Sequence, residues 1–302
     1  MSKANKAFNA TTSEKIFDVA NYVVMGLILI VTLYPFLNVL AISLNESSDT
    51  VRGGIYLWPR EFTLENYKTI FQYDGLIQGA QVSLARTIVG TVLGLVSSSM
   101  VAYTLARPDF RAKKFVSTFL ALTMYFSGGL IPGYILMRDL NLIGTFWIYI
   151  FPALISAFNV FVIRSFIDGL PYALQESAKL DGANDFKIYY KIILPLCKPV
   201  LATIALFLAV GQWNSWFDTY LYNGSKPELT TLQYELMKVL QSTQQGSGAT
   251  VNANDMAQQM ANISPESIRM AITIVVTVPI LVVYPFLQKY FVGGMTLGAV
   301  KA

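Results

Sequence analysis

Histidine is absent from the 302-residue sequence, and cysteine occurs once, at Cys197. The missing imidazole removes the commonest general base and metal ligand of proteins, and a single thiol forms no intrachain disulfide and no multi-cysteine metal site. Charged residues make up only 13% of the chain, against about 25% in a soluble domain. No Gly-x-x-x-x-Gly-Lys-Ser/Thr phosphate-binding sequence is present. We therefore expect no catalytic residue, metal site or cofactor on this chain.

Long apolar runs are what the sequence has instead. Hydrophobic residues make up 54% of it, and its mean hydropathy is +0.49. A helix needs about 20 apolar residues to cross the roughly 30 Å of hydrocarbon in a bilayer. The sequence predicts an all-α polytopic membrane protein with six transmembrane helices, at residues 19–44, 79–106, 115–137, 143–167, 199–222 and 267–291. The first run is longer than the apolar core of a cleaved signal peptide, so we expect it to be retained.

Lys and Arg residues indicate the orientation, because cytoplasmic segments carry an excess of them. They collect before the first run, after the second and fourth runs, and at the C-terminal end. Both termini are therefore expected in the cytoplasm. The cytoplasmic segments would be 1–18, the loop 168–198 and the tail 292–302, and the long external loops 45–78 and 223–266. The net charge of +4 is too small to indicate nucleic-acid binding, so lipid is the expected surrounding partner.

Local patterns add detail to these segments. Gly128, Gly129, Pro132 and Gly133 interrupt the third run and predict a broken helix, a feature that often borders a cavity at membrane depth. Thr63, just before LENYKTIF, predicts a capped short helix in the first external loop.

The loop 168–198 contains the most informative pattern. Residues 172–180 favour a helix, Gly182 permits a turn, and Asn184 or Asp185 can cap a second helix that runs to about Leu194. About 30 residues is more than a tether between two spans needs. We expect a docking surface here, the alternative being a helical hairpin that packs only on its own spans.

Glu176-Ser177-Ala178, then Gly182, then Ile192-x-Leu194-Pro195 resembles the Glu-Ala-Ala…Gly…Ile-x-Leu-Pro loop of the membrane subunits of bacterial ABC importers, with Ser in place of one Ala. The stretches WPREFTLENYKTIF, FSGGLIPGYIL and FVGGMTLGAVKA are similar to the carbohydrate branch of that family, and in particular to the second permease of maltose and oligosaccharide importers.

The resemblance implies a permease subunit of an ATP-driven carbohydrate importer, with an oligosaccharide as the expected substrate. The subunit would not be an enzyme itself, because two cytoplasmic ATPase subunits would bind ATP and Mg²⁺. The other implied partners are a homologous second permease and an extracellular or periplasmic sugar-binding protein, which the loop 223–266 would contact. The implied location is the bacterial cell membrane.

The resemblance also assigns roles to residues. The ATPase-coupling element would comprise Glu176, Ser177, Ala178, Gly182, Leu194 and Pro195. The tail, with Gly293, Gly294, Gly298 and Lys301, would be a second ATPase contact, unless it is only a frayed terminus.

Polar and aromatic residues gather late in the fifth run, where polar groups at membrane depth are costly. The candidates for a substrate path are Gln212, Trp213, Asn214, Trp216, Asp218 and Tyr220. An interfacial aromatic belt is the alternative, and it fits Trp216, Asp218 and Tyr220 better than Trp213 and Asn214. Arg86, in the second run, either snorkels to the surface or points into the cavity.

Two other classes of protein remain in view. A self-contained secondary transporter usually keeps an acidic residue in the middle of its spans, and none lies there in this sequence. An integral membrane enzyme is disfavoured by the missing histidine and by the lack of grouped carboxylates. Cys197 is expected to pack as a small apolar residue.

Overall fold

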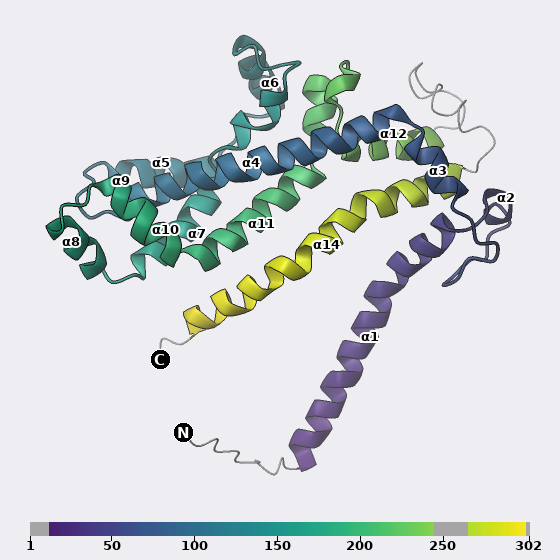
Figure 1. Cartoon of the computed structure of the whole chain (residues 1–302), viewed down its shortest axis with the longest axis horizontal. Helices are drawn as coiled ribbons and strands as arrows, with labels where there is room; N and C mark the ends of the chain where they lie inside the picture. The colour runs from purple at the N-terminus through teal and green to yellow at the C-terminus, as the bar shows by residue number, and fades with distance from the viewer. Residues whose placement is uncertain (1–11, 245–264, 300–302) are drawn as a thin grey trace. The chain divides into compact units, whose positions relative to one another are not determined.

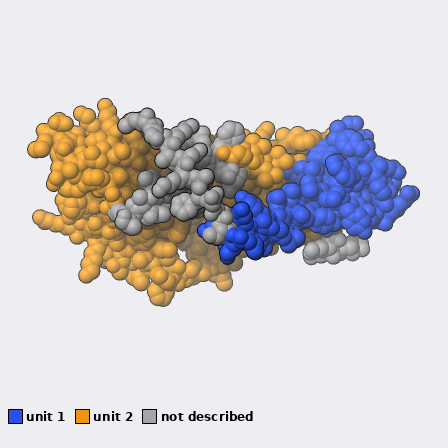
Figure 2. Space-filling model, turned by 90° about the horizontal axis from the view of Figure 1, so that it is seen from below, with its two compact units in different colours: residues 1–70, 254–274 blue, residues 71–253, 275–302 orange. Residues whose placement is uncertain are grey.

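The computed structural model describes the backbone of residues 12–244 and 265–299. Within these residues the secondary structure is helices and turns, with no strand and one isolated antiparallel bridge between Asn45 and Phe62. The predicted all-helical class is therefore confirmed for the described residues. The chain forms two compact units, one of residues 1–70 and 254–274 and the other of residues 71–253 and 275–302 (Figure 2).

The first unit contains α1 (Thr12–Ser43), α2 (Ser47–Thr50), most of α3 (Glu65–Phe71) and the start of α14 (Pro265–Ala299) (Figure 1). A run of Leu, Ile and Val with no charge makes α1 a helix that satisfies its own backbone in lipid. The predicted short helix is confirmed as α3, and the hydroxyl of Thr63 accepts a hydrogen bond from the Glu65 amide at 3.1 Å.

Two buried asparagines organise the segment between α1 and α3. The Asn45 carboxamide accepts hydrogen bonds from the backbone amides of Arg60 and Glu61 at 2.8 and 3.0 Å, and it donates to Asp49 Oδ2 at 3.0 Å. The Asn66 amide donates to the carbonyls of residues 43 and 45, both at 2.9 Å. The loop therefore has a polar core rather than an apolar one.

The second unit is built on a single long helix, α4 (Asp74–Ala106). Its other elements, in chain order, are α5 (Lys113–Tyr125), α6 (Leu130–Asp139), η1 (Phe146–Tyr149), η2 (Phe151–Ala153), α7 (Ala157–Asp168), α8 (Ala173–Leu180), α9 (Asp185–Ile188), η3 (Tyr189–Ile193), α10 (Leu194–Leu196), α11 (Lys198–Asn214), η4 (Thr219–Asn223), η5 (Pro227–Leu229), α12 (Leu232–Gln244) and the rest of α14. Helices α7 and α11 both pack along α4 (Figure 1).

Small side chains on α4 allow close packing, at Gly90 and Gly94 against α11 and at Gly79 and Ser83 against the start of α12. Gly79, Ser83, Gly90, Gly94 and Ser98 are buried along one face of the helix. Such spacing of small residues lets helix backbones approach each other in a membrane protein. The opposite face is a stripe of exposed apolar side chains, namely Leu84, Ile88, Val92, Val96 and Met100. One face of α4 therefore packs against other helices of this chain, and the opposite face is exposed.

The C-terminal end of α4 shares an apolar core with the segment after α7. Tyr103 and Leu105 of α4 and Ile163 of α7 are buried there with Ile188 of α9 and Ile193 of η3. Cys197 is a free thiol in the same core, 1% exposed, as predicted from its apolar character.

Six spans were predicted, and the structure supports part of this count. Among the described residues, α1, α4 and residues 266–283 of α14 are long and apolar enough to cross a membrane. Two bent pairs also pass: η1–η2 with α7, at 48°, and the residues from α9 to α10 with α11, at 84°. The total is three helices, or up to five if each bent pair is one span, so the count of six and the placement of the termini stay predictions.

The third predicted span differs most from expectation. It consists of α5 and α6, each too short to cross a bilayer alone. Gly129, between them, has φ +89°, which glycine adopts without strain. The predicted break is thus confirmed at Gly128 and Gly129, whereas Pro132 and Gly133 lie in the first turns of α6, where proline is tolerated.

Two helix ends also differ from the predicted bounds. The α-helix of the fifth predicted span ends at Asn214, and residues 219–223 form the separate π-helical turn η4. Helix α14 continues past the predicted boundary at 291 to Ala299, so Gly293, Gly294 and Gly298 lie within it. Lys301 lies outside the described residues.

The polar core of the first unit generates a stability prediction. Asp49→Ala removes the acceptor of Asn45 Nδ2 and of Arg60 Nε, which lies 2.9 Å from Asp49 Oδ2. Loss of these two hydrogen bonds, and of the charge that Arg60 pairs with, destabilises the folded loop. We expect severalfold faster amide hydrogen exchange in residues 45–66, measured by mass spectrometry on the purified full chain.

Glu65→Gln is the control, because the Glu65 carboxylate pairs with Lys68 only at the exposed surface. The hydrogen bond from Asn45, followed by Arg60, lowers the pKa of Asp49. The carboxylate therefore stabilises the loop above its ordinary pKa, and this contribution is lost as pH falls through the lowered value. The difference between the parent and Asp49→Ala should disappear in acid, and a difference that persists there would contradict this account.

Candidate functional site

A buried polar cluster lies where α4, α11 and η1 meet. Arg86 of α4 is only 2% exposed, and its neighbours are Gln212, near the end of α11, Asp218, just before η4, and Tyr149 of η1. These residues come from three of the predicted spans. The cluster therefore joins segments that are more than a hundred residues apart in the chain.

Every part of the Arg86 guanidinium has a partner. Its Nε donates to Gln212 Oε1 at 3.0 Å, Nη1 donates to Asp218 Oδ1 at 3.2 Å and to the Ser215 carbonyl at 3.3 Å, and Nη2 lies 2.5 Å from Asp218 Oδ2. The guanidinium carbon lies 4.4 Å from the centroid of the Tyr149 ring, a cation–π distance. A paired arginine with satisfied donors is the form in which a charge is tolerated in a low-dielectric interior.

The cluster also needs glycine at position 90. A Cβ atom there would lie 2.7 Å from Nε2 of Gln212, closer than van der Waals contact allows. Gln212 Nε2 in turn donates to the Tyr149 carbonyl at 3.2 Å. Arg86 therefore neither snorkels to the surface nor faces an open cavity, the two alternatives that the sequence left open.

The six predicted substrate-path residues fall into different environments. Gln212 and Asp218 are bound to Arg86, and Trp213 Nε1 donates to the Val276 carbonyl of α14 at 3.0 Å. Asn214 is exposed at the end of α11. Trp216 and Tyr220 contact each other at 6.4 Å between ring centroids, and Tyr220 is 58% exposed. The structure thus separates internal packing groups from the accessible Asn214 and Tyr220.

The predicted helix pair is confirmed in the segment between α7 and α11. Helix α8 ends at Leu180, Gly182 has φ +74°, and the Asn184 side chain caps α9 by accepting a hydrogen bond from the Lys187 amide at 2.9 Å. The left-handed φ at Gly182 is strained for residues with a Cβ. Glycine therefore sets the angle between α8 and α9.

The six predicted coupling residues divide by exposure. Glu176 and Ser177 are exposed on α8, whereas Ala178 is 7% exposed and packs into the core shared with α4. Leu194 packs partly against the same core, and Pro195 follows it in α10. The motif thus has an outward part and an inward part.

Three apolar side chains of the helix pair are exposed as well, and no motif in the sequence marks them. Leu180 is 90% exposed, Phe186 65% and Leu174 41%. The apolar character of these residues was visible in the sequence, but their orientation depends on the turn at Gly182. Exposed large apolar side chains make the helix pair a candidate contact surface.

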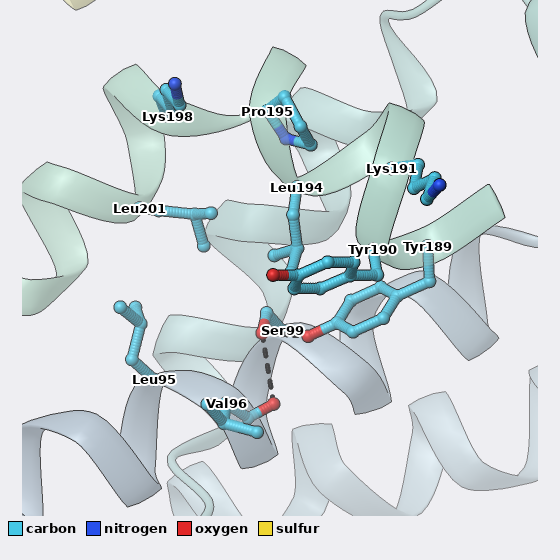
Figure 3. Close-up of a pocket in the computed structure, with 10 residues that line it drawn as sticks. All are labelled: Leu95, Val96, Ser99, Tyr189, Tyr190, Lys191, Leu194, Pro195, Lys198 and Leu201. Atoms are coloured by element: carbon cyan, nitrogen blue, oxygen red, sulfur yellow. Dashed lines mark hydrogen bonds between the residues drawn. The ribbon is translucent and has the colours of Figure 1, made fainter. Parts of the chain in front are cut away.

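Tyr189 attaches the helix pair to α4. Its hydroxyl and the Ser99 hydroxyl are 2.8 Å apart, and its ring centroid lies 5.5 Å from that of Tyr103. A pocket of about 590 Å³ opens beside this contact. Figure 3 shows Ser99 and Tyr189 together in it, with Leu194 and Pro195 above them.

Comparisons with known proteins agree with this architecture. Residues 88–297 match the family described as binding-protein-dependent transport system inner membrane component. The chain is 36% identical to Protein LplC of Bacillus subtilis (strain 168), over 96% of this chain and 97% of that protein. It is 35% identical to the polygalacturonan/rhamnogalacturonan transport system permease protein YtcP of the same organism, over 95% and 99%.

Solved structures give the same result. A chain in the crystal structure of a bacterial ABC transporter involved in the import of the acidic polysaccharide alginate matches with a TM-score of 0.81 and 28% identity, over 93% of this chain and 98% of that chain. A chain of the bacterial alginate ABC transporter in complex with alginate pentasaccharide-bound periplasmic protein matches with a TM-score of 0.54 at 18% identity, which shows a likeness of fold alone.

The protein is therefore a permease, the membrane component of an ABC transport system. It belongs to the family of binding-protein-dependent transport system inner membrane components. The resemblance of its sequence to ABC importer permeases of the carbohydrate branch is confirmed.

The Arg86 cluster generates a second prediction. Arg86→Gln leaves the Asp218 carboxylate without its cationic partner, and loss of one partner of a buried pair costs roughly 3 kcal/mol in free energy of unfolding. We expect thermal melting of the detergent-solubilised protein to show this loss. Arg86→Gln with Asp218→Asn should lose less than the sum of the two single variants, because neither charge remains unpaired.

Arg138→Gln is the matched control, because that arginine is 61% exposed and pairs only with the adjacent Asp139 among the described residues. It should melt as the parent does. Strictly additive losses in the Arg86 and Asp218 variants would show that the two side chains do not stabilise the fold as a pair.

Proposed function

We propose that this permease is one of two membrane subunits of an ATP-driven importer of a carbohydrate, with an oligosaccharide as substrate, in the bacterial plasma membrane. The observation that carries the proposal is the exposed surface of the α8–α9 helix pair, which bears the Glu-Ser-Ala…Gly pattern. The names of the relatives, such as the arabinooligosaccharides permease AraQ of Halalkalibacterium halodurans at 32% identity, support the class of substrate.

In this proposal the helix pair lies in the cytoplasm and docks on an ATPase subunit, and each part of the motif has its own task. Glu176 and Ser177 contact the ATPase together with the apolar Leu180 and Phe186. Gly182 fixes the angle between the two helices, and the inward Ala178 and Leu194 hold the pair on the spans. Binding and hydrolysis of ATP with Mg²⁺ belong to the two ATPase subunits, so the permease itself is not an enzyme.

The membrane topology is part of the proposal. Six spans with both termini in the cytoplasm place the helix pair and the end of α14 on the same side of the bilayer. Gly293, Gly294 and Gly298 then bring that end of α14 towards the ATPases as a second contact. Lys301 would add a charge there.

A sugar would pass the accessible groups near the end of α11. Aromatic rings bind the C–H faces of a sugar, and carboxamides bind its hydroxyls, which suits Tyr220 and Asn214. Gln212 and Asp218 would support this path from behind through Arg86, and the homologous second permease would supply the other half. The sugar-binding protein would dock outside, on the loop 223–266, of which residues 245–264 lie outside the described residues.

A self-contained secondary transporter is the alternative function, and the Arg86 cluster argues against it. A proton- or sodium-coupled carrier needs an ionisable group that can bind and release its ion. Asp218 is the acidic residue of this cluster, and both of its carboxylate oxygens are bound by Arg86.

Native mass spectrometry of the complex tests the proposal. The full chain, tagged at its N-terminus, should bring down a second permease and two ATPase subunits. Leu180→Arg places a charge in the most exposed apolar contact of the helix pair and should lose the ATPases while keeping the second permease. Gly182→Pro should do the same, because proline cannot adopt φ +74°.

Leu140→Arg serves as the control, since Leu140 is also an exposed apolar residue, 57% exposed, but follows α6 rather than lying on the helix pair. It should retain every subunit. A parent chain that purifies alone, or only with copies of itself, refutes the importer function.

A further inference from the structure

A group of four charges lies at the C-terminal end of α4, outside the motif that defines the coupling loop. Arg107 directly follows α4, and Pro108 disfavours helical backbone at the residue before it. Arg107 accordingly has extended backbone, with φ −69° and ψ 132°. Its side chain leaves the helix axis and reaches the segments beside it.

Arg107 binds two carboxylates from different elements. Its Nε donates to Asp109 Oδ1 at 2.8 Å, Nη2 pairs with the other oxygen of Asp109, and Nη1 pairs with Oδ2 of Asp185, the first residue of α9. Lys179 of α8 lies 3.6 Å from Asp109 Oδ2. The four side chains therefore join the end of α4 to both helices of the pair.

Charge and burial favour a lasting contact. The Arg107 side chain is 17% exposed, whereas Asp109 and Asp185 are 50% and 53% exposed, so the cation of each pair is the partner shielded from solvent. The hydrogen bond from Arg107 holds the pKa of Asp109 at about 2, and Asp109, followed by Asp185, raises the pKa of Arg107. Both partners stay charged across physiological pH. A planar guanidinium that binds two carboxylates also fixes their orientation relative to each other, which the single ammonium group of a lysine does not do.

At the start of α9, the ion pairs border a cavity. A cavity of about 330 Å³ lies there, and Arg107, Asp109 and Asp185 line it together with Phe186. Phe186 itself is 65% exposed. Ala183, just before α9, packs against the apolar core, which includes Ile188 one turn into the helix. At Asp185 itself the contact with the end of α4 is the ion pair with Arg107.

We propose that Arg107 is a positioning residue of energy coupling: it latches the α8–α9 helix pair to the end of α4, so that the pair and the span move as one body. The proposal rests on the proposed docking of the helix pair on an ATPase. Without Arg107 the pair stays folded on its apolar core and still docks, but it swings relative to α4 when the ATPases bind nucleotide.

Spin-label distance measurements on the assembled complex test the latch. The labels are placed at Val92→Cys on α4, which is 54% exposed, and at Lys187→Cys on α9, in a Cys197→Ala background that has no other thiol. In the parent, trapping with Mg-ATP and vanadate should leave the distance distribution unchanged. In Arg107→Gln the distribution should broaden, and nucleotide trapping should shift it by several ångström, while the ATPases still co-purify.

Arg111→Gln is the matched control, because it removes the same charge from the same loop and no ion pair of Arg111 is found among the described residues. Asp185→Asn, which keeps the Arg107–Asp109 pair, should reproduce the nucleotide-dependent shift. The double variant Asp185→Asn with Arg107→Gln should show a shift smaller than the sum of the shifts of the two single variants. Arg107→Lys should give an intermediate shift.

An Arg107→Gln distribution that stays as narrow and as insensitive to nucleotide as the parent overturns the latch. A shift that appears equally in Arg111→Gln also overturns it, because general loss of charge would then be the cause. If the parent chain purifies without ATPase subunits, the proposed docking function is refuted instead. In that case the distance distributions of the parent and Arg107→Gln without nucleotide still show whether Arg107 holds α9, because loss of the contact should broaden the distribution.

Discussion

The close approach of α7 and α11 to α4 is the interaction on which the second unit depends. Gly90 and Gly94 provide it for α11, because no bulky side chain separates the two helices, and Gly79 and Ser83 do the same for the start of α12. In a bilayer this matters more than apolar burial, since lipid tails are as apolar as leucine. One result is that the Gln212 side chain fits over Gly90 and reaches Arg86. The polar cluster thus follows from the spacing of small residues.

Several polar side chains of this protein make contacts between helices that are distant in the sequence. Arg86 and Asp218 join α4 to the segment after α11, Tyr189 and Ser99 join the helix pair to α4, and Arg107 adds a second joint at the end of the same helix. Two of these contacts hold the helix pair on α4, while Leu174 and Leu180 of α8 stay exposed. The helix pair is thus fixed to α4 at two places by polar contacts in addition to its apolar core.

The sequence predicted the features that depend on local chemistry. The turn at Gly182, the cap at Asn184 and the break at Gly128 and Gly129 follow from glycine and asparagine conformational preferences, and all three are found. It did not predict which side of the helix pair is open, because that depends on which residues meet α4. Nor did it predict that Gln212 and Asp218 bind Arg86 while Asn214 stays accessible, since that distinction rests on one arginine more than a hundred positions earlier. Long-range pairing carries no local pattern.

The sequence separation within the Arg86 cluster has a consequence for how the protein is made. Asp218 follows Arg86 by 132 residues, and Gln212 follows it by 126. A chain that enters the membrane during synthesis therefore inserts α4 well before either partner exists. Until then the arginine must stay near water or be sheltered by the insertion machinery, because an unpaired charge in hydrocarbon is costly. The late arrival of one carboxylate thus sets the moment at which α4 can settle to its final depth.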